Sequence, residues 1–181
     1  MNRFHGNISQ PSVYGESYPL GPTIFPDGVN FSLFCKNGTL VELLLFDHID
    51  DIHPSKVIIL DPKRNRTYHY WHVFIPGIKN GQLYAYRIKG PFEPWNGHRF
   101  DDSQILLDPY AKIVAVPGSY NRFSPNLPLE KRTPAMRSVV ADLSLYNWEE
   151  DKHPQHSFAR TVIYEMLLPC RGIHLTHAKV V

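Results

Sequence analysis

Acidic side chains that lie close together in the sequence are the first candidates for acid–base chemistry. The candidates considered are the neighbours Asp101-Asp102, the run at residues 149–151 and, within an apolar segment, the single Glu165. General acid–base catalysis needs carboxyl groups positioned around one reacting bond, whereas charge clusters ordinarily face solvent. A structural role for Glu165, in an ion pair or at a strand end, is the simpler interpretation. The sequence therefore predicts no catalytic residue.

Histidine and cysteine are the side chains that could hold a metal. The histidine pairs that first suggest a metal site are His69/His72 and His174/His177. A zinc site needs three or four convergent ligands, and the chain has no His-Glu-x-x-His motif. The two cysteines are far apart, which excludes a disulfide framework and favours a reducing compartment. We predict no metal, no cofactor and a cytoplasmic location.

The composition indicates a folded protein without a strongly charged partner. The chain has 181 residues, 43% of them hydrophobic, enough to bury one core and to begin a second domain. Its formal charge of +2 gives no electrostatic argument for binding nucleic acid. No apolar run reaches the ~20 residues of a membrane span. We therefore predict neither a nucleic-acid partner nor a membrane partner.

Turn residues and apolar alternation predict a mainly β chain up to residue 116. Expected strands cover residues 29–36, 40–46, 56–60, 68–75 and 82–89. Residues 40–46 are apolar on both faces apart from Glu42, which is typical of a central strand between two layers. Asn37-Gly38 predicts a hairpin turn between the first two strands, and the last two are predicted to pair as another hairpin. The spacing indicates an immunoglobulin-like antiparallel β-sandwich.

The pattern changes after the last of these strands. Residues 90–100 combine turn formers with aromatic residues and have no period, which predicts an ordered loop. Residues 120–137 carry three prolines among charged residues, which predicts a long surface loop. Residues 161–167 are apolar on both faces, as in a buried parallel sheet. That strand has no partner left in the chain, so we expect a larger sheet to follow.

A set of short motifs occurs in one order along the chain. They are YPLGPT at 18–23, GVNFSLF at 28–34, VELLLFD at 41–47, YWHVF at 70–74, GQLYAYR at 81–87, GHRF at 97–100 and LLDPYAK at 106–112. Together they make the sequence similar to the N-terminal domain of isoamylase-type glycogen debranching enzymes, from about residue 18 to residue 166. No single motif is specific, but the collinear set is.

The resemblance implies four regions. Residues 1–17 are an N-terminal extension, residues 18–116 a β-sandwich of the carbohydrate-binding module 48 kind, residues 117–160 a linker, and residues 161–181 the first strand of a truncated (β/α)8 barrel. In this family the catalytic carboxylates follow later barrel strands and would lie beyond Val181. The complete enzyme would hydrolyse α-1,6 branch linkages in glycogen, whereas this chain is expected to be inactive.

The end of the sequence departs from the family pattern after Met166. The family continues with something like His-Val-Arg-Gly-Phe-Thr, whereas Leu167-Leu168-Pro169-Cys170 follows here. Codons allowed for residues 169–174, read one base later, can spell the expected motif. We hypothesise a shifted reading frame after Met166, which the nucleotide sequence through this position and beyond it would test.

Aromatic side chains are the natural contacts for a sugar partner, because the apolar face of a glucose ring stacks on Trp or Tyr. The candidates are Trp95, Trp71, Tyr84 and Tyr86. Strand alternation places at least one of the last three in a core-facing set, so core packing is the competing interpretation. Trp95, in the predicted loop, is the best candidate for exposure, and burial of Trp95 under the missing barrel is the alternative. Glycogen or another α-glucan is the expected partner.

The GHRF motif carries the other expected role. The resemblance implies that His98, Arg99 and Phe100 lie where the sandwich meets the catalytic barrel, the missing intramolecular partner, and that they pack across domains rather than transfer protons. Two alternatives remain for the whole chain. It could act alone as a glucan-binding or interaction module, or be a nonfunctional gene remnant with exposed apolar residues around Val162 and Met166.

Overall fold

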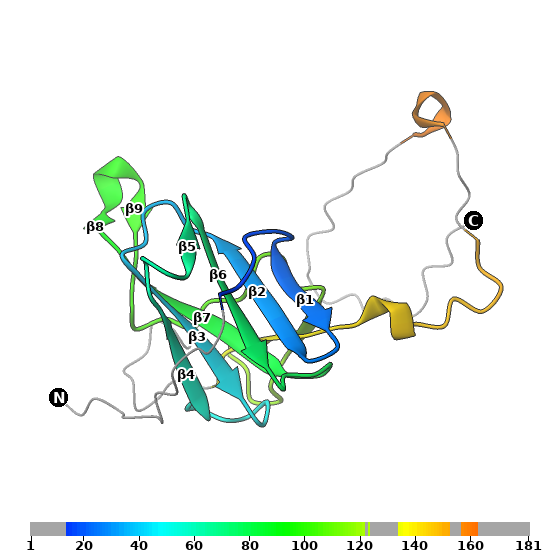
Figure 1. The fold of residues 1–181 in the computed structure, drawn as a ribbon, viewed down its shortest axis with the longest axis horizontal. Coiled ribbons are helices and arrows are strands. Elements are labelled where there is room, and N and C mark those ends of the chain that lie inside the picture. Colours follow the sequence, from blue (N-terminus) through cyan, green and yellow to red (C-terminus); the bar gives the residue numbers. More distant parts are fainter. Residues whose placement is uncertain (1–13, 122, 124–133, 153–156, 163–181) are drawn as a thin grey trace. The chain divides into compact units, whose positions relative to one another are not determined.

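Two antiparallel sheets contain most of the regular structure in this computed structural model, which describes residues 14–121, 123, 134–152 and 157–162 (Figure 1). The first sheet has the strand order β1 (Gly21–Phe25), β2 (Gly28–Phe34), β6 (Tyr70–Pro76) and β5 (Arg66–Thr67). The second has the order β10 (Ile113–Ala115), β11 (Arg137–Val139), β7 (Leu83–Lys89), β3 (Leu40–Phe46) and β4 (Lys56–Leu60). A separate pair joins β8 (Phe92–Glu93) to β9 (His98–Arg99).

In the part of the chain that the structure describes, helical structure is confined to single turns. The described residues hold the 3₁₀ turns η1 (Pro94–Asn96), η4 (Leu143–Leu145) and η5 (Phe158–Arg160). Within these described residues no helix has the length and apolarity to cross a membrane. The prediction of a mainly β chain with antiparallel sheets is confirmed.

The core lies between the two sheets. Alternate residues of β2 and β3 face each other there, and Val29, Phe31, Val41 and Leu43 are at most 1% exposed. Burying side chains of this size contributes roughly 1.5–3 kcal/mol each. This alternation, which was readable in the sequence, holds the two layers together.

The central position predicted for residues 40–46 is also confirmed. Strand β3 pairs with β7 on one side and β4 on the other. Its second face carries Leu44 and Phe46, which pack with Ala85 and with the partly buried Ile105 outside the main core. Tyr86 and Leu106 exchange backbone hydrogen bonds of 2.9 and 2.8 Å. Leu106 therefore lies alongside β7 as a β-bridge, and the neighbouring Ile105 packs on the second face of β3, in keeping with the apolar residues on both sides of this strand.

Both predicted hairpins are wrong. Strand β6 lies in the first sheet and β7 in the second, and the turn at Asn37-Gly38 likewise connects β2 to β3 across the sandwich. Facing sheets lie about 10 Å apart, and a short turn spans that gap as readily as it closes a hairpin. A Cβ on Gly38 would come within 2.6 Å of the Cys35 Sγ atom, so this crossing needs glycine.

Two segments that flank the predicted sandwich bond to its strands. Strand β11 lies within the predicted linker and pairs with β7 through Ser138↔Tyr84. In the predicted N-terminal extension, the Glu16 backbone N–H donates to Asn30 Oδ1 at 2.8 Å, and Ser32 donates to the Ser17 carbonyl at 2.7 Å. Strand β11 thus provides backbone partners for the edge of β7, and residues 16–17 provide partners for the polar side chains of β2.

The chain divides into two compact units, Met1–Tyr146 and Asn147–Val181. In the second unit the described residues include the turn η5 and Val162, whose side chain is 91% exposed. The predicted barrel strand from residue 163 onward, with Glu165 and the hypothesised frame change after Met166, lies outside the described residues.

Candidate functional site

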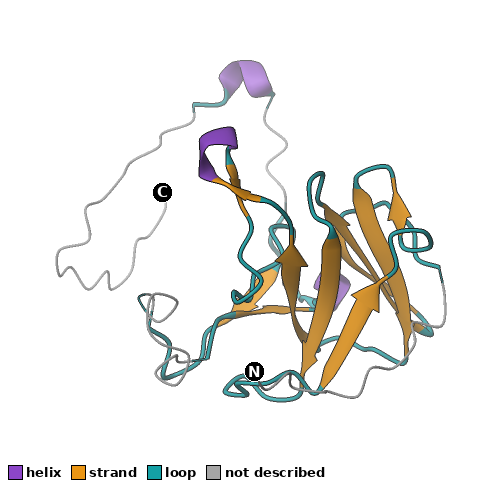
Figure 2. Ribbon diagram, turned by 90° about the vertical axis from the view of Figure 1, so that its left-hand side faces the viewer, coloured by secondary structure: helices purple, strands orange, loops and turns teal. Residues whose placement is uncertain are grey.

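The predicted loop at residues 90–100 is a small ordered hairpin. Phe92 pairs with Arg99 and Glu93 with His98, while η1 forms the tip between these strands. Gly97 closes the tip in the left-handed region at φ +80°, and its N–H donates to the Pro94 carbonyl at 3.1 Å. Figure 2 shows the hairpin extending beyond the ends of the sheets. Pro94 and Gly97 thus fix a tight turn where the sequence pattern shows no period.

Trp95 stands at this tip and is 80% exposed. Phe92, in the adjoining strand, is 67% exposed. The Asn96 side-chain amide donates to Glu93 Oε2 at 3.0 Å, so an amide and a carboxylate are held in the same turn. The hairpin therefore presents two exposed aromatic rings, together with polar groups that can exchange hydrogen bonds with hydroxyls.

Contacts at the base of the hairpin hold it to the sandwich. Phe100 is partly buried against the core, and a Cβ on Gly90 would lie 2.5 Å from the Phe100 ring. The His98 Nδ1 atom lies 3.4 Å from the Asn37 side-chain nitrogen. Arg99 is exposed. Two of the three GHRF side chains thus contact the sandwich itself, and the predicted contact with a further domain stays a prediction.

Trp71, Tyr84 and Tyr86 are core residues, with exposures of 0%, 0% and 2%. The indole N–H of Trp71 donates to the Cys35 carbonyl at 3.1 Å. Their rings offer no face to a ligand, so the structure removes these three from the sugar-binding candidates. The physical reason is the strand alternation itself, which directs all three side chains between the sheets.

A buried polar network joins the second sheet to the segment that follows the hairpin. The Tyr84 hydroxyl donates to Asp108 Oδ2 at 2.8 Å, and the Tyr110 N–H donates to Asp108 Oδ1 at 2.8 Å. The Asp108 N–H donates to Ser138 Oγ at 2.9 Å. Burial raises the pKa of Asp108, and burial next to this carboxyl raises the pKa of Tyr84. Sequence reasoning did not single out Asp108, although it stands in the LLDPYAK motif.

The other acidic candidates do not converge. Asp102 forms an ion pair with Lys89 at 3.1 Å, and Asp101 accepts from the Ser103 backbone N–H at 2.9 Å. Residues 149–151 are exposed. These contacts support the solvent-facing interpretation of both acidic clusters.

The histidine pair His69/His72 has no companions that would make a metal site. Among the residues that the structure describes, no group of three or more His, Cys, Asp or Glu side chains could hold an ion. His72 Nε2 lies 2.9 Å from the Thr67 hydroxyl, and burial lowers the pKa of His72. The second pair, His174/His177, lies outside the described residues.

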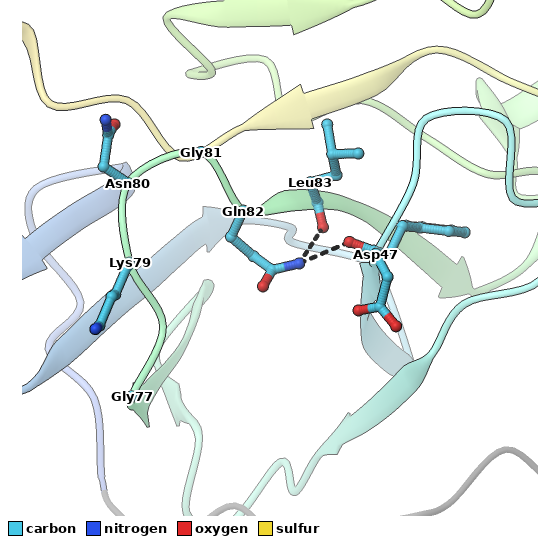
Figure 3. Close-up of a pocket in the computed structure, with 8 residues that line it drawn as sticks. Asp47, Gly77, Lys79, Asn80, Gly81, Gln82 and Leu83 are labelled. Carbon is cyan, nitrogen blue, oxygen red and sulfur yellow. Dashed lines mark hydrogen bonds between the residues drawn. The ribbon is translucent and has the colours of Figure 1, made fainter.

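A shallow cavity of about 350 Å³ lies at the other end of β7 from the hairpin (Figure 3). Two of its polar side chains, Gln82 and Asn80, already have partners. Gln82 donates to the carbonyls of Phe46 and Leu83 at 2.8 and 3.0 Å, and Asn80 accepts from the Asp142 N–H at 2.9 Å. These bonds join the β6–β7 connection to β3 and to the chain after β11. The polar groups of Gln82 and Asn80 therefore stabilise the fold at this end of the sandwich.

A β-sandwich that holds an aromatic hairpin rigidly in solvent has the architecture of a carbohydrate-binding module. The sequence profile of carbohydrate-binding module 48, the isoamylase N-terminal domain, matches residues 19–111, which is more than half of the chain. The chain belongs to this family.

Relatives and solved structures agree with this assignment. The chain is 40% identical over 152 residues to isoamylase 1, chloroplastic, of Arabidopsis thaliana, covering 82% of this chain and 19% of that protein. It is 36% identical over 174 residues to the glycogen debranching enzyme of Serratia proteamaculans, covering 92% and 24%. It therefore spans about a fifth to a quarter of the length of these curated relatives. The pullulanase from Bacillus acidopullulyticus has a similar fold, with a TM-score of 0.50 at 18% identity over 72% of this chain and 13% of the pullulanase.

Proposed function

We propose that this chain is the N-terminal region of a glycogen debranching enzyme and that its hairpin tip binds α-glucan. The observation that carries the proposal is the exposed Trp95 ring, held in a fixed turn beside Glu93 and Asn96. A ring of this size excludes water from the apolar face of a glucose unit, while the amide and the carboxylate exchange hydrogen bonds with its hydroxyls.

The chain by itself is inactive in this proposal. Retaining hydrolysis of a glycosidic bond needs two carboxyl groups about 5–5.5 Å apart. The acidic clusters of the described residues are instead engaged in local contacts or lie in solvent, as at Asp102 and residues 149–151. Hydrolysis of α-1,6 branch linkages would belong to a following barrel that begins near residue 161. His98, Arg99 and Phe100 would lie at its contact with the sandwich.

Native gel electrophoresis with and without glycogen tests the binding step. The unmodified chain is expected to migrate more slowly in glycogen, and Trp95→Ala should abolish most of this retardation. Trp148→Ala is the matched control, because Trp148 is 65% exposed but belongs to the other compact unit. Equal retardation of Trp95→Ala and the unmodified chain would overturn the proposal. A reducing-sugar assay on branched glucan should show no turnover.

A stand-alone binding module is the second candidate function. The compactness of Met1–Tyr146 as one unit favours it, since this unit has its own core between the two sheets. It predicts that residues 1–146 alone bind glycogen as well as the whole chain does. Loss of binding on removal of residues 147–181 would exclude it. In both cases we place the protein in the cytoplasm, in keeping with its low cysteine content.

A further inference from the structure

A group of aromatic rings on the outer face of the first sheet has no role in the core. It consists of Phe34, Tyr68, His69 and Tyr70, and we call it the Tyr68 cluster. Tyr68 is 79% exposed and Phe34 is 48% exposed. The ring centroids of Tyr68 and His69 lie 3.9 Å apart, those of Phe34 and His69 6.1 Å, and those of Phe34 and Tyr70 5.4 Å. Contacts between neighbouring rings thus make one continuous aromatic surface.

The backbone holds Tyr68 outward at a conformational cost. Its φ is +59°, in the left-handed region that bulky residues rarely adopt. Arg66 fixes this conformation, because its Nε donates to the Tyr68 carbonyl at 2.9 Å and its Nη2 donates to the Lys36 carbonyl at 3.0 Å. The Cys35 N–H donates to the His69 carbonyl at 2.8 Å. Three hydrogen bonds therefore keep an exposed ring in a strained position, where folding gains no burial from it.

The Tyr68 cluster lies at the same end of the sandwich as the Trp95 hairpin. Phe34 ends β2 and Tyr70 begins β6, and these two residues pair across the strands. The β2–β3 turn then reaches the hairpin, where Asn37 lies 3.4 Å from His98. In Figure 1 the short strand β5 and the β8–β9 hairpin lie at this same end. A polymer bound at the hairpin therefore has a second aromatic surface on the same end of the molecule.

We propose that the Tyr68 cluster is a second contact site for the α-glucan chain. This inference rests on the proposed function, since it takes the same ligand as the Trp95 hairpin. Glucose units of an α-glucan turn progressively along the chain, and rings set at 40°, 86° and 66° to one another offer differently oriented faces to successive units. Lys36, whose carbonyl accepts from Arg66, is an exposed residue, and its ammonium group can donate hydrogen bonds to sugar hydroxyls.

Isothermal titration with maltoheptaose tests the site in two backgrounds. Tyr68→Asn removes the ring and keeps a residue that tolerates the left-handed backbone. We expect this change to weaken binding about tenfold in the unmodified chain, the equivalent of losing one good stacking contact. In the Trp95→Ala background it should remove the remaining affinity. Tyr14→Asn is the control, because Tyr14 is 68% exposed and precedes Gly15, which packs against the middle of β6 at Val73.

The outcomes separate this inference from the proposed function. Unchanged affinity in Tyr68→Asn, with lost affinity in Trp95→Ala, would overturn the second site and leave the hairpin site standing. Weakened binding in Tyr68→Asn with unchanged binding in Trp95→Ala would support the cluster and overturn the hairpin site. Amide shifts of residues 68–70 on titration of the unmodified chain give a readout that does not depend on folding of a variant. Absence of such shifts at saturation would also overturn the proposal.

Discussion

The buried hydroxyls of Tyr84 and Tyr86 allow a controlled test of what holds the sandwich to the segment that follows the hairpin. Both tyrosines lie in β7 and are at most 2% exposed. The Tyr84 hydroxyl donates to Asp108 at 2.8 Å, whereas the Tyr86 hydroxyl is buried without a hydrogen-bond partner among the described residues. The same Tyr→Phe change at the two positions therefore differs chiefly in the loss of one hydrogen bond.

The expected magnitudes follow from that difference. A hydrogen bond to a charged group contributes about 1.5–3 kcal/mol, so Tyr84→Phe should lower the free energy of unfolding by that amount. For a chain of this size Tm should fall by about 3–12 °C. Tyr86→Phe should leave stability unchanged or raise it slightly, because it removes a buried polar atom that lacks a partner.

Urea unfolding followed by near-ultraviolet circular dichroism measures both changes. The slope of the unfolding free energy against urea concentration should stay the same in the two variants, since neither changes the surface exposed on unfolding. An equal loss of stability in Tyr84→Phe and Tyr86→Phe would refute the reasoning. It would mean that ring packing, and not the bond to Asp108, determines the cost.

Three further predictions concern two buried polar side chains and one closely packed glycine. Burial raises the pKa of Asp108 above its usual 3.8, so the folded state binds the carboxyl proton more tightly than the unfolded state does. The stability that this proton adds is fully present below about pH 3.8 and is lost as the pH rises through the folded-state pKa. Urea unfolding of Asp108→Asn and of the unmodified chain should therefore show a difference in stability that moves in favour of the variant as the pH rises above about 4. Arg137 is fully buried, with its guanidinium 3.9 Å from the Phe46 ring and donating to the Asp51 carbonyl at 2.9 Å. Arg137→Lys should cost about 2 kcal/mol by the same assay, because one ammonium group cannot replace the planar fork; an unchanged unfolding midpoint would contradict this. A Cβ on Gly28 would lie 2.3 Å from the Ile75 carbonyl oxygen, so Gly28→Ala should lower Tm measurably in a thermal scan, whereas Gly118→Ala, where a Cβ meets nothing within 4 Å, should not.

The strands could be predicted from the sequence because their burial follows a period. Val29, Phe31 and Leu33 alternate with polar residues, and the structure buries all three. The partners of the strands could not be predicted in the same way. A turn such as Asn37-Gly38 serves a hairpin or a crossing between sheets equally well, and the choice depends on packing against Cys35 in the folded core. Strand β11 has only three residues, too few to show a period.

The candidate site was predictable only in part, for a related reason. The exposure of Trp95 followed from its place among turn residues without an apolar period. The Tyr68 cluster did not follow, because the pattern treats residues 68–75 as one strand. In the structure β6 begins at Tyr70, and the positive φ of Tyr68 turns its ring outward instead. That conformation depends on hydrogen bonds from Arg66, a contact that the sequence pattern does not contain.

Stability and sugar affinity should be separable in this molecule, because different contacts support them. The hairpin is fixed by its own turn at Gly97, by Phe100 against Gly90, and by the contact between Asn37 and His98. None of these contacts includes Asp108. Tyr84→Phe should therefore lower Tm and leave glycogen retardation intact at temperatures well below unfolding, while Trp95→Ala should do the reverse. Loss of retardation in Tyr84→Phe while it remains folded would mean that the Asp108 network positions the hairpin, and that the site extends further into the sandwich than its exposed rings.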